Sequence, residues 1–142
     1  MKASLWLNIA ILLCAGLLQA QTVYHPGQEI HVAVTFDGPY VLKIKKVQIA
    51  ASIPTAPDSQ PGFKTEIFLT ESKPTGPNTF DVWYRVPDNQ ASGDYPLKQI
   101  RAGVSDSSLT LFYESEDFPA RTLKIENIQS FVKPKIKDVQ VP

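Results

Sequence analysis

The sequence predicts an all-β domain, an antiparallel sandwich of about seven short strands. Apolar and polar residues alternate in several short stretches, which is the period of a strand that buries one face. Clusters of proline, glycine and asparagine separate these stretches. No window longer than one turn carries the 3.6-residue apolar period of an amphipathic helix. Short alternating segments with turn residues between them favour two antiparallel sheets packed face to face.

The clearest strand pattern covers residues 80–86. One set of side chains is apolar and is expected to face the core: Phe80, Val82, Tyr84 and Val86. The other set is expected to point outward: Asp81, Trp83 and Arg85. Pro87 ends this strand, because a proline has no N–H for the hydrogen-bonded ladder.

A second strand follows after a polar turn, so residues 80–100 are predicted to form a hairpin. Tyr95 and Leu97 resume the apolar face, and we expect Tyr95 to be largely buried. The next apolar residue comes one position late. This spacing predicts a β-bulge near Lys98 and Gln99.

Alternation predicts further strands on both sides of this hairpin. They cover residues 29–36, 40–51, 63–70, 108–113 and 122–128. The phase changes at residues 45–46, which indicates a second bulge. The connecting segments are a lead-in at 21–26, a proline-rich loop at 52–62, a turn at 73–78 and an acidic loop at 114–119. Residues 131–142 are expected to be either an extra edge strand or a linker.

Residues 1–20 are predicted to be a secretory signal peptide. A positive start is followed by an apolar run at 5–18, and Ala20 supplies the small residue before a cut at Gln21. The apolar run is shorter than the ~20 residues that a membrane span requires. Acylation at Cys14 is the alternative, although Leu13 stands where lipoprotein signals carry a small residue.

The predicted mature chain is one domain at residues 21–130 followed by the tail at 131–142. It has no cysteine, since Cys14 leaves with the signal, so disulfides and thiolate metal sites are excluded. The full sequence has 14 basic and 14 acidic residues, and the loss of Lys2 with the signal leaves 13 basic residues against 14 acidic ones. This balance argues against nucleic acid as a partner. We expect the protein to be periplasmic or secreted, without a membrane span.

Several turn segments resemble those of bacterial immunoglobulin-like domains. They are Pro26-Gly27, Phe36-Asp37-Gly38-Pro39 and the segment from Val86-Pro87 through Ser92-Gly93-Asp94-Tyr95-Pro96-Leu97. The resemblance covers most of residues 26–128. It implies an immunoglobulin- or fibronectin-III-like sandwich that serves in adhesion, substrate binding or spacing. Fold alone does not choose among these functions.

Residues suited to catalysis or metal binding are few. His25 and His31 are the only histidines, and no nucleophile elbow accompanies them, so we expect no enzyme activity and no cofactor. Periplasmic copper carriers share this class of sandwich but bind through an amino-terminal histidine, where this chain would have Gln21. Two acidic clusters could offer oxygen ligands to Ca²⁺, or could simply be turn residues. The clusters are Asp88, Asn89 and Asp94, and Glu114, Glu116 and Asp117.

Trp83 is the strongest candidate for a binding residue. It shares the outward phase with Asp81 and Arg85, and charged neighbours favour an exposed indole of the kind that anchors interfaces. Phe68 is outward by the same alternation, and we expect Trp83, Phe68, Asp81 and Arg85 to form the partner-binding surface on one sheet face. The alternative is that the tail or a loop covers Trp83. The sequence therefore predicts a non-catalytic exported module that engages a protein or carbohydrate through a sheet face. A small periplasmic Ca or Cu protein, or an enzyme accessory domain, is the alternative.

Overall fold

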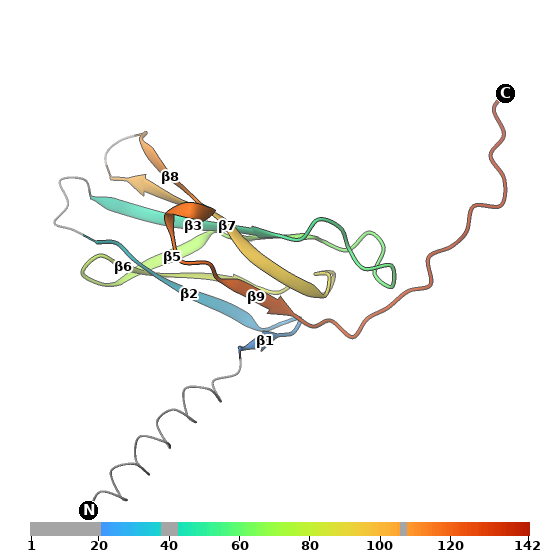
Figure 1. The fold of residues 1–142 in the computed structure, drawn as a ribbon, viewed down its shortest axis with the longest axis horizontal. Coiled ribbons are helices and arrows are strands. Elements are labelled where there is room, and N and C mark those ends of the chain that lie inside the picture. Colours follow the sequence, from blue (N-terminus) through green and yellow to red (C-terminus); the bar gives the residue numbers. More distant parts are fainter. Residues whose placement is uncertain (1–20, 38–42, 106–107) are drawn as a thin grey trace, which may run out of the picture.

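The computed structural model describes residues 21–37, 43–105 and 108–142, and these residues form an all-β fold. The predicted signal peptide, the Gly38-Pro39 turn and residues 40–42 of the strand predicted at 40–51 lie outside the described residues. Nine strands and one short 3-10 helix, η1 (Ser115–Asp117), are present in the described ranges. The strands form two sheets that face each other, as Figure 1 shows.

The larger sheet has six strands, and it is mixed. Its strands, in spatial order, are β1 (Val23–Tyr24), β9 (Thr122–Ile125), β7 (Gly93–Val104), β3 (Ile44–Ser52) and β4 (Glu66–Leu69), with β8 (Thr110–Glu114) also paired to β7. Strand β7 is long enough to pair with β9 near its start and with β8 near its end. The β1–β9 pair is parallel, and the other pairs are antiparallel.

The smaller sheet consists of β2 (Glu29–Thr35), β6 (Thr79–Arg85) and β5 (Glu71–Gly76), all antiparallel. Both sheets contribute inward side chains to one apolar core. The smaller sheet supplies Ile30 and Val82, and the larger supplies Ile49, Ile67 and Tyr95, all at most 1% exposed. The predicted inward phase of residues 80–86 is therefore confirmed, with Tyr84 only partly buried.

The predicted hairpin over residues 80–100 is wrong, because β6 and β7 belong to different sheets. Backbone pairing with Gly27 and Gln28 holds Val86 in line with the smaller sheet. The chain then hydrogen-bonds at residues 89–91 with the backbone of Lys64, which lies just before β4 of the larger sheet. These contacts, made to residues distant in the sequence, carry the connection across the core.

One further expectation about the strands is corrected. The strand predicted at 63–70 is present as β4, over Glu66–Leu69, and the chain changes sheets directly after it, since Leu69 pairs with β3 while Glu71 pairs with β6. The turn predicted at 73–78 is largely strand β5. Pro74 is tolerated there because β5 is an edge strand.

The two ends of the domain also differ from expectation. The lead-in contains β1, so the larger sheet is not purely antiparallel. The structure has more strands than the seven that were predicted, because the lead-in and the 73–78 turn are both paired. Residues 131–142 form no strand and extend away from the sheets, which excludes the extra edge strand (Figure 1).

Both predicted bulges are confirmed. The β3–β7 register shifts between Ile44 and Lys46, and it shifts again where Gln99 and Leu97 oppose consecutive residues of β3, which leaves Lys98 unpaired. The predicted burial of Tyr95 is also confirmed, since the residue is 0% exposed.

Candidate functional site

The outer side of the smaller sheet carries the predicted residue Trp83. We call it the Trp83 face and define it by Glu29, His31, Lys73, Asp81, Trp83 and Arg85, which come from all three strands. His31 lies directly opposite Trp83 and stacks on it at 6.2 Å between ring centroids, with 26° between the planes. From the strand on the other side, Lys73 places its Nζ 5.8 Å from the indole centroid. Trp83 points outward as predicted, but it is only partly exposed.

Charged partners fix His31 on this face. Its Nδ1 lies 2.9 Å from Asp81 Oδ2, and its Nε2 lies 3.0 Å from Glu29 Oε1. These hydrogen bonds raise the pKa of His31 above its ordinary value, with Asp81 as the largest cause and Glu29 next. Arg85 donates to the Gly27 carbonyl at 2.7 Å and lies 3.4 Å from Glu29. The polar groups of the Trp83 face are therefore engaged mainly with one another.

Phe68 does not share a face with Trp83. Phe68 belongs to β4 of the larger sheet, whereas Trp83 belongs to β6 of the smaller one. Each residue points away from the common core, so the two lie on opposite outer sides of the fold. The expectation that Phe68, Asp81, Trp83 and Arg85 form one surface is wrong. Asp81 and Arg85 remain beside Trp83.

A second surface surrounds Phe68 on the outer side of the larger sheet. We call it the Phe68 face and define it by Gln48, Ala50, Phe68, Gln99, Arg101, Phe112 and Glu114. The strand register sets Phe68, Ala50, Gln99 and Glu114 in one row across the sheet. Gln48, Arg101 and Phe112 form the adjacent row. Phe68 is 51% exposed and Phe112 is 58% exposed.

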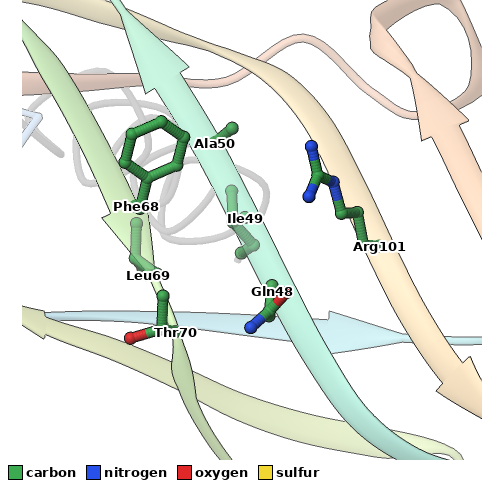
Figure 2. Close-up of a pocket in the computed structure, with 7 residues that line it drawn as sticks. All are labelled: Gln48, Ile49, Ala50, Phe68, Leu69, Thr70 and Arg101. Atoms are coloured by element: carbon green, nitrogen blue, oxygen red, sulfur yellow. The ribbon is translucent and has the colours of Figure 1, made fainter.

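A concavity of about 130 Å³ opens on this face between Phe68 and Arg101. Figure 2 shows the two side chains rising from the strands on either side of β3, with Ala50 and Gln48 between them. Thr70 adds a hydroxyl to the lining. The site thus combines an aromatic ring, a cation, an amide and a hydroxyl around a floor of small and aliphatic residues.

Neighbouring side chains hold Arg101 in place. Its Nε donates to Gln99 Oε1 at 2.7 Å, and Gln99 donates through Nε2 to Glu114 Oε1 at 2.8 Å. Its guanidinium carbon lies 5.6 Å from the centroid of Phe112, a cation–π distance. The cation is therefore oriented before any ligand arrives.

A larger cavity of about 380 Å³ lies between the sheets, beside the end of β2. Its walls include Val34, Phe36 and Phe118, and its charged lining groups are Asp37 and Asp117. Asp117 accepts a hydrogen bond from the Glu114 backbone N–H at 2.9 Å, so it caps η1. The lining supplies carboxylates, apolar groups and the side chains of Thr35 and Tyr113, but no cation or amide that would orient a ligand there.

The two histidines have partners within the fold. His25 Nδ1 lies 3.0 Å from the Glu126 carbonyl, and His31 contacts the two carboxylates described above. Across residues 21–37, 43–105 and 108–142, no three His, Asp or Glu side chains gather closely enough to hold a metal ion. In the same ranges, no helix has the length and apolar character needed to cross a bilayer.

Comparisons with known proteins do not identify this chain. No protein-family model, curated protein or solved structure matches it. The two outer faces of the sandwich are therefore the features of this chain that bear on its function.

Sequence reasoning missed Arg101, Gln99 and Phe112 as site residues. A signal for Phe112 was available, because Leu109, Leu111 and Tyr113 alternate with it in the other phase. Arg101 was harder to place, because the bulge at Lys98 changes which side chains of β7 point outward.

Proposed function

We propose that this protein is a non-catalytic, exported binding module that engages a protein or glycan through the Phe68 face. Its export follows from the signal-like residues 1–20. The proposed fold is an immunoglobulin-like sandwich. The Tyr95 hydroxyl supports it by donating to the Ala91 carbonyl at 2.6 Å, four residues upstream, as in the tyrosine corner of such domains.

The observation that carries the proposed site is the pair of exposed rings on one sheet face. Phe68 and Phe112 are each more than half exposed, and an ordered Arg101 lies between them. Exposed aromatic residues and arginine dominate the energy of many binding surfaces.

The Trp83 face is the weaker candidate for the same function. His31 and Lys73 flank the indole from the strands on either side, so its faces are already in contact with the protein's own side chains. A partner would reach chiefly the edge of the ring. Trp83 therefore serves mainly to order its own sheet.

Three alanine variants test which face binds. The labelled mature protein is applied to arrays of glycans and of extracellular proteins, beside Phe68→Ala, Phe112→Ala and Trp83→Ala. We expect each phenylalanine variant to reduce the binding free energy of the partner by ~2 kcal/mol or more, with little change in melting temperature. Trp83→Ala is the matched aromatic control and should retain binding. Loss of binding in Trp83→Ala alone would assign the function to the Trp83 face instead.

A further inference from the structure

We propose that the ligand of the Phe68 face is an acidic polysaccharide, and that the concavity beside Arg101 takes the carboxylate and ring of one uronic-acid residue. This inference rests on the proposed function, because it names the chemical class of ligand for the same site. Four features of the Phe68 face support it.

The first feature is the aromatic wall. Phe68 stands at the side of the concavity with half of its surface exposed. The C–H bonds on one side of a sugar ring carry partial positive charge, and an aromatic face carries the negative part of its quadrupole. Phe68 can therefore hold a pyranose ring by its apolar side, whatever the charge of its substituents.

The second feature is the oriented cation. Arg101 donates a hydrogen bond through Nε to Gln99. Among the described residues, no acceptor is hydrogen-bonded to its terminal Nη atoms. A guanidinium binds a carboxylate through two parallel N–H···O bonds. The bond to Gln99 and the contact with Phe112 fix its direction in advance, which lowers the entropy cost of binding.

The third feature is the set of neutral polar groups beside the cation. The Gln48 amide and the Thr70 hydroxyl line the same concavity, and each can both donate and accept. Sugar hydroxyls need partners of this kind. The volume of about 130 Å³ admits part of one sugar residue rather than a folded partner's side-chain cluster.

The fourth feature is the spacing of the two exposed rings. Phe112 on β8 lies three strands from Phe68 on β4, which corresponds to about 14 Å across the sheet. A polysaccharide lying across the strands would meet Phe68, then the polar side chains of β3 and β7, then Phe112. A protein–protein interface instead favours a continuous apolar centre with a polar rim, whereas the Phe68 face has polar groups at its centre and a ring at each side.

Calorimetric titration with matched oligosaccharides tests this assignment. The probes are trigalacturonic acid and its neutral methyl ester, and the protein is the mature chain. We expect the acid to bind at least ten-fold more tightly than the ester. Arg101→Gln should reduce affinity for the acid to that for the ester and leave the ester unchanged, whereas Phe68→Ala should weaken both.

Lys73→Gln on the Trp83 face is the matched control, because it removes the same formal charge from the opposite side. It should leave both affinities unchanged. Melting temperatures of all variants establish that they fold. Equal binding of acid and ester, with dependence on Phe68, would overturn the acidic ligand and leave the proposed function standing. Binding that is unchanged in Phe68→Ala would contradict both the acidic-glycan assignment at this site and the proposed role of the Phe68 face. No binding of either probe or of any arrayed glycan would contradict the acidic glycan as the ligand.

Discussion

Tyr95 joins the core to the polar connection that precedes β7. Its ring is fully buried, and its hydroxyl donates to the Ala91 carbonyl while accepting from Gln90 Nε2 at 3.0 Å. Burial raises the pKa of this phenol, so it stays protonated and keeps its donor at neutral pH. One residue thus fixes both the packing and the direction of the chain as it changes sheets.

Two substitutions at Tyr95 separate these contributions. Tyr95→Phe should cost about 1–2 kcal/mol in the free energy of unfolding, because the Ala91 carbonyl loses its donor. Tyr95→Ala should cost on the order of 3 kcal/mol, since it also removes the ring from the core. Chemical denaturation measures both. Tyr24→Phe is the control. If Tyr95→Phe lowered the free energy of unfolding no more than Tyr24→Phe does, the Tyr95 hydroxyl would not stabilise the fold.

His31 makes the Trp83 face sensitive to pH. Its pKa is raised in the folded protein above the unfolded value of about 6.5. The stabilising contribution is therefore fully present below about pH 6.5 and is lost as the pH rises through the folded pKa. Asp81 is the larger cause of the shift, so it should control the effect more than Glu29 does.

An NMR titration of the His31 imidazole measures this pKa directly. We expect Asp81→Asn to lower the pKa more than Glu29→Gln does. We also expect the pH dependence of unfolding to weaken in His31→Gln. A wild-type pKa at or below the model-peptide value would contradict the observed contacts.

At the scale of elements, three buried polar side chains connect the loops at one end of the fold: Gln60, Gln90 and Asn127. Gln60 donates to the carbonyls of Asn127 and Gln129 and accepts from the Ser92 backbone N–H. Asn127 in turn donates to the Asp88 and Gln90 carbonyls. The network ties the 52–62 loop, the β6–β7 connection and the start of the tail together.

Removing one member of this network should destabilise the fold although no apolar contact is lost. Asn127→Ala leaves the buried Gln90 carbonyl and the part-buried Asp88 carbonyl without this donor, at a cost of about 1–3 kcal/mol in unfolding free energy. Hydrogen exchange should accelerate at Ser92 and Gln129, whose N–H groups bond within the network. Gln140→Ala in the exposed tail is the control. Unchanged stability and exchange in Asn127→Ala would show that the network does not hold these loops.

Local pattern predicted some elements well and failed where distant contacts decide. The bulges at Lys45 and Lys98 were visible, because a bulge shifts the apolar phase within a single strand. The placement of β6 and β7 in different sheets was not, since it depends on residues 89–91 pairing with Lys64. The sequence predicted a turn in place of strand β5 because a proline, here Pro74, is excluded from interior strands. An edge strand tolerates a proline, and only the fold shows that β5 lies at an edge.

The same distinction explains what could be predicted of the site. Alternation correctly turned Trp83 and Phe68 outward, because it reports which side of its own sheet a residue occupies. It does not report which sheet the strand joins, so the two residues were wrongly placed together. The two adjacent rows that hold Phe68 and Phe112 depend on the register of four strands, which only the fold supplies.

At the scale of the whole molecule, the proposed function requires that the chain reaches an extracellular or periplasmic protein or glycan. We predict that the exported protein begins at Gln21, because residues 1–20 have the order of a cleavable signal peptide. Intact mass spectrometry of exported protein tests this. Retention of Cys14 with an attached acyl chain would instead make the protein a lipoprotein.

The fold presents two outer faces to such a partner, and their residues differ in what they leave free. On the Trp83 face, charged groups pair with one another around a partly exposed indole that His31 and Lys73 flank. On the Phe68 face, two rings and a guanidinium are open to solvent beside a concavity. This difference is the reason for assigning binding to the larger sheet.

Amide NMR of the mature protein titrated with trigalacturonic acid tests that assignment most directly. The account predicts that chemical shift changes cluster at residues 48–50, 68–70, 99–101 and 112–114, on the outer rows of β3, β4, β7 and β8. The amides of His31, Asp81 and Trp83 should remain unchanged and serve as the internal control. Changes centred on Trp83, or no changes on either face, would contradict it.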